Sequence, residues 1–289
     1  MRYLVSLLMF FIPFSSVGHV FFKLEHAEYP TSYLFGTMHM LCGPEVEIPA
    51  NVQQAFIDSQ QLVVEIDLTD IQQIREIQAN IRQQPTNYLD EHLTEEQQTQ
   101  LSERVEQVLQ APYPAMKEIR PFLLNALFMQ HYMDCPDSML LMDEAFITRA
   151  KMAQKTVVGL ETALQQLQVF DSLPLAEQVT SLLEVALNPE QTKVELKALE
   201  ELYLSDNSEA LHRHILAESE GTPQFEEAVL IERNHSWVEQ LQEILPQHSS
   251  FIAVGAGHLG GQDGLIQLLQ QQGYQLTPIA VDFKAQTEH

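Results

Sequence analysis

Basic residues are scarce in this chain of 289 residues. It has 15 lysines and arginines against 40 aspartates and glutamates, which gives a formal net charge of −25 at pH 7. A surface this acidic repels the phosphates of nucleic acids and of anionic membrane faces. We therefore expect no nucleic-acid partner, and we interpret the charge first of all as a contribution to solubility.

Cysteine is scarce as well, and the common zinc signatures are absent, because the chain contains neither H-E-x-x-H nor C-x-x-C. Its two cysteines are Cys42 and Cys135. In an oxidising compartment they could form a disulfide, and closing so long a loop would add about 4 kcal/mol of stability. Two unpaired buried thiols are the alternative that the sequence leaves open.

Only the N-terminus carries a long apolar run. Arg2 precedes the apolar residues 3–14, and small residues follow up to Gly18. The run is shorter than the about 20 residues that span a bilayer. Its order of basic, apolar and small residues is typical of a secretory signal peptide. We expect a signal peptide at 1–18 and an exported, periplasmic or secreted protein without a membrane span after signal removal; an uncleaved envelope anchor or a buried N-terminal strand is the alternative.

Strand and helix patterns alternate at both ends of the chain. Two short strands around a turn at Pro30 precede a helix at 49–60 and a strand at 61–67, which suggests a parallel β-α-β unit. Residues 248–282 return to strand, helix and strand. Between them, 70–247 is mostly helical, with one strand at 155–161. We expect a single α/β domain, 19–289, whose mixed or parallel sheet is built from 19–70 and 248–282 and carries a large helical insertion.

The string FIAVGAGHLGG, residues 251–261, contains G-x-G-x-x-G after a predicted strand. Such glycines can bring the backbone close to a dinucleotide pyrophosphate, and Asp282 lies near where a ribose-binding acid would fall. The further β-α units that a nicotinamide site needs are missing. We therefore interpret the glycines as a tight turn that presents His258, and we expect no dinucleotide cofactor.

Two G-x-x-H strings, Gly36 to His39 and Gly255 to His258, each follow an apolar strand. Because ligand sites in open α/β sheets form beyond the carboxyl ends of strands, we expect the two histidines to belong to one site. Glu65 lies within the apolar strand 61–67, where an unpaired carboxylate would cost several kcal/mol. Two imidazoles and a carboxylate form a divalent-metal set, so His39, Glu65 and His258 are the predicted ligands. Ordinary loop or core histidines, with Glu65 near solvent, are the alternative.

One arginine is expected to join this site. Arg233 lies in a predicted helix, 229–245, that buries Leu230, Trp237, Leu241 and Leu245. We predict a catalytic role for Arg233 beside Glu65, as a group that stabilises an oxyanion or binds a carboxylate. An exposed salt bridge with Glu232 or Glu239 is the alternative, and we expect His235 to lie on the surface.

The chain resembles the TraB/GumN family, which is related to the TIKI metalloproteases and to the ChaN-like and erythromycin-esterase-like proteins. The resemblance covers about residues 20–282 and rests on the strings YLFGTMHM, VVEID, GLET, IERNHSW and FIAVGAGHLGGQDGLIQLLQQQGY. It implies an α/β core with a helical insertion and a metal-dependent peptidase activity, with manganese or cobalt as activators.

Carried onto this chain, the resemblance implies His39, Glu65 and His258 as metal-site residues, with Arg233 as their polar partner. It adds two secondary site candidates, Asp143 and Glu161, through the string DEAFITRAKMAQKTVVGLET, and it favours a Cys42–Cys135 disulfide. No substrate can be carried over from the family.

We therefore expect an exported metal-dependent hydrolase of peptidase type that acts on a peptide or small-molecule substrate. A manganese, cobalt or zinc ion would polarise a carbonyl and lower the pKa of a bound water to about 7. Glu65 is either a ligand or the general base. The alternative is a non-catalytic peptide-binding or inhibitory protein that uses the same pocket.

Overall fold

A six-stranded mixed sheet forms the centre of the computed structural model, which describes residues 18–42, 47–133, 135, 138–218 and 223–283. The strand order is β6-β4-β7-β2-β1-β8. The parallel strands are β6 (Thr156–Glu161), β4 (Gln61–Ile66), β7 (Ser250–Gly255) and β2 (Ser32–Thr37). The antiparallel strands are β1 (Phe21–Glu25) and β8 (Gln275–Pro278).

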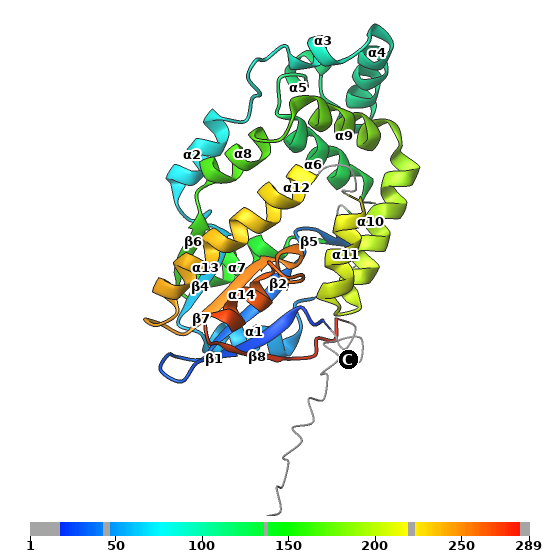
Figure 1. Ribbon diagram of the computed structural model, residues 1–289. Helices are drawn as coiled ribbons and strands as arrows, with labels where there is room; N and C mark the ends of the chain where they lie inside the picture. The colour runs from blue at the N-terminus through cyan, green and yellow to red at the C-terminus, as the bar shows by residue number, and fades with distance from the viewer. Residues whose placement is uncertain (1–17, 43–46, 134, 136–137, 219–222, 284–289) are drawn as a thin grey trace, which may run out of the picture.

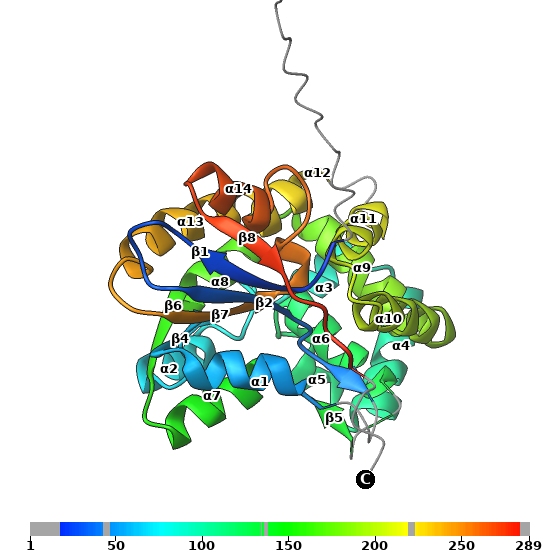
Figure 2. The ribbon, with the colours of Figure 1, turned by 90° about the horizontal axis from the view of Figure 1, so that it is seen from below.

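Helices cover both faces of this sheet, so its central strands are apolar on both sides. Figure 2 shows α1 (Ala50–Asp58) and α7 (Met142–Met152) on one face, and α13 (Glu232–Ile244) and α14 (Leu265–Gln271) on the other. In β7, the run from Phe251 to Val254 is fully buried. These strands and helices share one hydrophobic core.

The predicted α/β class is confirmed, and so is the expectation that the two ends of the chain build one sheet. Two features of the strand order differ from the predictions. β7 lies between β2 and β4, so the strands of the predicted β-α-β unit are parallel but not neighbours. β6, from the helical middle, joins the same sheet at its edge. The last strand ends at Pro278, three residues earlier than predicted, although Ile279 N still donates to Phe21 O at 2.9 Å.

The helical middle forms a cap beyond the carboxyl ends of the parallel strands (Figure 1). Its helices are α2 (Ile71–Ala79), α3 (Tyr88–His92), α4 (Glu95–Arg104), α5 (Tyr113–Met116), α6 (Pro121–Tyr132), α8 (Ala163–Asp171), α9 (Leu175–Leu187), α10 (Pro189–Leu204), α11 (Ser208–Glu218) and α12 (Pro223–Phe225), with π-helical turns η1 (Val105–Leu109) and η2 (Glu226–Ile231). A second hydrophobic cluster, including Leu101, Leu124, Phe128 and Leu182, holds α4, α6 and α9 together. The cap therefore has a core of its own above the sheet.

The predicted signal peptide lies outside the described residues, apart from Gly18, so its cleavage stays a prediction. Within the part of the chain that the structure describes, no helix combines the length and the apolar character needed to cross a membrane.

A disulfide joins Cys42 to Cys135, with their Cα atoms 5.6 Å apart, which confirms the pairing implied by the resemblance. Beside it, β3 (Leu41–Cys42) pairs with β5 (Met139–Leu140). The disulfide closes a loop with a sequence separation of 93 residues. It therefore ties the first part of the sheet domain to the cap.

Replacing both cysteines by serine is expected to lower the free energy of unfolding by about 4 kcal/mol, because the open chain regains the entropy that this loop closure removes. Urea denaturation of the oxidised protein and of the Cys42→Ser/Cys135→Ser variant measures the difference. Wild type unfolded with a reductant should behave like the variant. Equal unfolding midpoints for the oxidised protein and the variant would contradict the expectation.

Candidate functional site

The predicted site residues gather at the edge where the four parallel strands end. Glu65 is the second-last residue of β4 and Glu161 ends β6. His39 follows β2, and His258 closes the short 3-10 helix η3 (Ala256–His258) after β7. The carboxyl edge of a parallel sheet is where ligand sites of open α/β proteins form. Strand order, not distance along the chain, brings these side chains together.

Gly255 is the point at which the three predicted metal ligands converge. Its N–H donates to Glu65 Oε1 at 2.8 Å. A Cβ atom on Gly255 would lie 3.2 Å from Glu65 Oε1, 3.6 Å from His258 Cδ2 and 3.9 Å from His39 Nε2. The three side chains therefore border one small space, which we call the Gly255 cradle, and a larger residue than glycine would fill it.

Arg233 is bonded through all five of its N–H donors to other groups of the chain. Nη2 donates to Glu65 Oε2 at 2.6 Å and to Glu161 Oε1 at 2.7 Å, and Nε donates to Glu161 Oε2 at 3.1 Å. Nη1 donates to Val229 O at 3.0 Å and lies 3.1 Å from His258 Nε2. Only 7% of this side chain is exposed, so the alternative of a surface salt bridge is wrong. No N–H of Arg233 is left over for a substrate.

His258 is buried and held in one tautomer by its neighbours. Its Nδ1 lies 2.7 Å from Asn234 Oδ1, which can only accept, so Nδ1 carries the proton and Nε2 accepts from Arg233. The ring packs on Trp237, with the centroids 4.4 Å apart. Burial lowers the pKa of His258 to about 3, although the charge of Glu65 opposes the shift. His258 is therefore neutral at physiological pH.

The two glutamates respond differently to burial. Burial alone would raise the pKa of Glu65, but the positive charges of Arg233 and His39 and the hydrogen bond from Gly255 lower it to about 2. For Glu161, burial dominates and raises the pKa despite its bonds to Arg233. Gln166 Nε2 bridges the pair, at 3.3 Å from Glu65 Oε2 and 3.1 Å from Glu161 Oε1. Glu65 is thus the firmly ionised carboxylate of the cluster.

His39 is the exposed member of the cluster, with 68% of its side chain accessible. Its Nδ1 lies 2.7 Å from Asp143 Oδ2, and Thr37 Oγ1 donates to Asp143 Oδ1 at 2.7 Å. The hydrogen bond with Asp143 raises the pKa of His39 to about 9. Among the described residues, no hydrogen-bond partner faces His39 Nε2. A carboxylate that orients an imidazole through Nδ1 is a common arrangement around metal-binding and catalytic histidines.

The disulfide and the β3–β5 ladder hold His39 and Asp143 in place. β3 begins two residues after His39, and Asp143 lies in the first turn of α7, directly after β5. Leu41 pairs with Leu140 and Cys42 with Met139, and Cys42 N donates to Glu200 Oε1 at 2.6 Å. The two segments that supply the imidazole and its carboxylate are thus joined by covalent and backbone bonds.

Sequence reasoning found His39, Glu65, Arg233 and His258, while the resemblance added Asp143 and Glu161; the structure brings all six into one cluster. Sequence reasoning missed Asn234, Gln166 and Thr37, each of which contacts a site residue. Asn234 directly follows Arg233 and Thr37 lies within the first G-x-x-H string, so the motifs contained both. The position of Gln166 in α8 carries no such signal. His235, expected on the surface, exposes 54% of its side chain.

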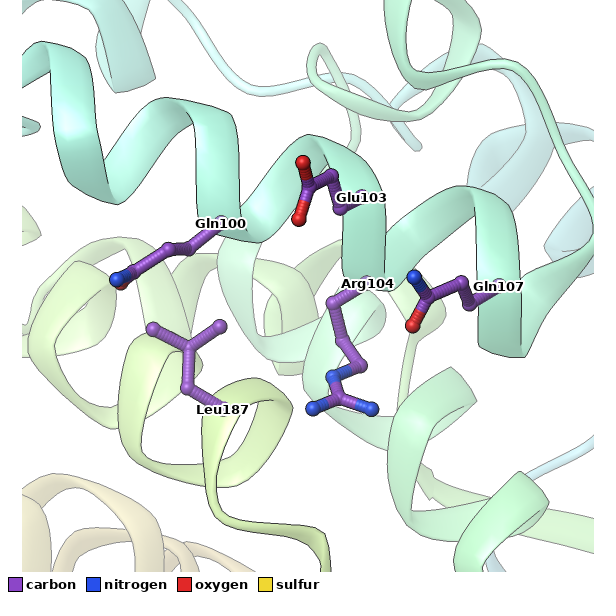
Figure 3. A pocket seen from close by; sticks show the side chains of 5 residues that line it. All are labelled: Gln100, Glu103, Arg104, Gln107 and Leu187. Atoms are coloured by element: carbon purple, nitrogen blue, oxygen red, sulfur yellow. The ribbon is translucent and has the colours of Figure 1, made fainter.

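Two pockets lie at different distances from the cluster. One, of about 290 Å³, lies in the cap and is lined by Gln100, Glu103, Arg104, Gln107 and Leu187, none of which belongs to the cluster (Figure 3). The other, of about 280 Å³, has Glu161 in its wall and therefore adjoins the cluster. Of these two pockets, only the second shares a residue with the cluster.

Fold and site together define a mixed α/β protein with a buried arginine–carboxylate–histidine cluster at the carboxyl edge of its parallel strands, under a helical cap. The TraB/PrgY/gumN family model matches residues 20–278, nearly the whole chain, and the chain belongs to this family. No curated protein and no solved structure matches the chain significantly. The relation to the TIKI metalloproteases stays a prediction.

Proposed function

We propose that this protein is a hydrolase of peptidase type that works with a divalent metal ion at the Gly255 cradle. The observation that carries the proposal is the convergence of His39, Glu65 and His258 on this one space. We also propose that it acts outside the cytoplasm, as a periplasmic or secreted protein, because disulfides such as Cys42–Cys135 persist in oxidising compartments.

The groups around the cradle fit a small divalent cation by their chemistry. Two imidazole nitrogens and a carboxylate oxygen suit manganese, cobalt or zinc. Glu65 Oε1 and His39 Nε2 border the cradle, whereas His258 Nε2 can take part only when Arg233 Nη1 gives up its contact. In the described ranges, no group of three or more His, Cys, Asp or Glu side chains is already arranged to hold a metal ion. Binding of a metal ion by all three residues would therefore require a small shift of Arg233.

The charge of the cluster also favours a cation. Glu65, Glu161 and Asp143 are three carboxylates with one guanidinium, that of Arg233, among them. When the carboxylates are ionised and both histidines are neutral, this leaves an excess of two negative charges. A divalent ion would balance it, and His39 would have to release its proton before binding.

When bound, the ion would act as a Lewis acid on a substrate carbonyl. The other roles fall to the chain itself. Asp143 and Asn234 hold the Nδ1 atoms of the two histidines, which directs their Nε2 atoms inward. Glu65, with a pKa of about 2, suits a ligand better than a general base, whose pKa should lie near the working pH. Arg233, with its donors occupied, positions Glu65, Glu161 and His258.

One observation favours a second candidate, a non-catalytic peptide-binding or inhibitory protein. Arg233 already bonds to Glu65 Oε2 and His258 Nε2, as in a cluster that serves only to stabilise the fold. The two functions share the pocket, and metal-dependent turnover separates them. A peptide library is incubated with metal-stripped protein and with protein reloaded with manganese, cobalt or zinc. Only the reloaded protein should give cleavage products. Absence of turnover with every metal would favour the binding protein.

Metal binding itself should be visible in thermal unfolding. Manganese, cobalt or zinc is expected to raise the Tm of metal-stripped wild type, because a ligand that binds only the folded state adds about 2.7 kcal/mol at a hundred times its Kd. His39→Ala should abolish the shift. His131→Ala, an exposed histidine on α6 outside the cluster, is the matched control and should keep it. A shift of equal size in His39→Ala would show that the ion binds elsewhere.

A further inference from the structure

The pocket beside Glu161 lies where β4 and β6 end and α8 begins. Its walls include Asp67, Gln73, Glu161, Thr162, Gln165 and Gln240, and its volume is about 280 Å³. Asp67 follows β4 two residues after Glu65, and Glu161 belongs both to this wall and to the Arg233 cluster. A molecule at the Gly255 cradle could therefore extend into this pocket.

The charges of the wall are all of one sign. Asp67 and Glu161 are carboxylates, and among the described residues no lysine, arginine or histidine lines the pocket. Thr69 N donates to Asp67 Oδ1 at 2.8 Å, while Oδ2 has no hydrogen-bond or ion-pair partner within the described ranges. Arg233 pairs with both Glu161 and Glu65, so its single positive charge offsets only part of the two negative charges. The pocket thus presents an unneutralised carboxylate.

The amide side chains of the wall are held in fixed orientations. Gln240 Nε2 donates to Leu160 O, which leaves Gln240 Oε1 as an acceptor. Gln73 Oε1 accepts from Ala163 N at 2.8 Å and Gln165 Oε1 accepts from Thr162 N at 2.7 Å, which leaves their Nε2 groups as donors. The acceptors suit a cationic head group, and the donors suit carbonyl oxygens next to it.

We infer that this pocket is a subsite for an ammonium or guanidinium group on a peptide-like molecule, such as a lysine or arginine side chain or a free amino terminus. As a substrate subsite it rests on the proposed hydrolase function; as a binding site it does not. The preferred substrate of the cluster would then carry its positive charge in contact with Asp67.

The test uses lysine amide with an acetylated α-amine as the probe and norleucine amide with an acetylated α-amine as its matched neutral counterpart, so that the two differ only by the side-chain ammonium, with binding measured by calorimetry at low ionic strength. Wild type should bind lysine amide saturably and at least tenfold more tightly than norleucine amide. Asp67→Asn keeps the Oδ1 acceptor for Thr69 N but loses the charge, so it should weaken lysine amide binding about tenfold or more. Asp58→Asn, an exposed acid of α1, should leave binding unchanged.

Equal affinity for the two amides, or unchanged binding in Asp67→Asn, would overturn the inference. Equal weakening in Asp58→Asn would overturn it too, since it would show general attraction to an acidic surface. His39→Ala should bind lysine amide like wild type, which separates this subsite from the proposed function. Binding without any turnover would refute the hydrolase alone, and turnover without preference for a basic residue would refute the subsite alone.

Discussion

Arg233→Met is expected to lower the free energy of unfolding by about 3–5 kcal/mol, because it leaves the charges of a buried ion-pair cluster uncompensated. Arg233 pairs with Glu65 at 2.6 Å and with Glu161 at 2.7 Å, and all three side chains are almost inaccessible to solvent. Removing the guanidinium also takes away the hydrogen bonds of its Nη1 to Val229 O and His258 Nε2. Urea denaturation of the variant and of wild type measures the loss.

Further variants show whether buried charge is the cause. Arg233→Lys keeps the charge without the planar fork and should fall between wild type and Arg233→Met. Adding Glu161→Gln to Arg233→Met should recover part of the stability, because one uncompensated carboxylate is then gone. The matched control is Arg82→Met, since Arg82 pairs with Glu118 while 63% exposed, and pairs of this kind contribute about 0–1 kcal/mol. Equal losses for Arg82→Met and Arg233→Met would disprove the structural role.

His39→Ala is expected to lower hydrolase activity about 100-fold or more while the protein stays folded. The side chain is 68% exposed, so its removal creates no cavity, and the loss of its pair with Asp143 at the surface should lower the free energy of unfolding by about 1 kcal/mol or less. His258→Ala should also lose activity, but with reduced stability, because this ring is buried against Trp237. The double variant should be little less active than either single variant, since groups that act as a unit are not additive.

Activity is measured with a peptide substrate from the library digest and stability by urea denaturation. Alanine at His131, on the exposed side of α6, should change neither quantity. If the losses of His39→Ala and His258→Ala multiplied in the double variant, the two histidines would work independently, and a shared site at the Gly255 cradle would be wrong.

The local pattern of the sequence was enough for the elements and for most of the site. Apolar runs before Gly36 and Gly255 indicate strands whose ends present His39 and His258, and parallel strands of one sheet share a carboxyl edge. The helix that buries Trp237 and Leu241 follows from its periodicity. Such patterns indicate which face of a helix or strand is buried, and a short stretch of sequence is enough to show them.

The tertiary structure decided what depends on neighbours distant in the sequence. β7 inserts between β2 and β4, which places Gly255 beside Glu65. β6 joins the edge of the sheet, so Glu161 reaches Arg233. The five bonds of Arg233, the exposure of His39 and the burial of His258 follow from that order. Periodicity in the sequence encodes burial but not the identity of the neighbouring strand, because adjacency is set by the packing of the whole core.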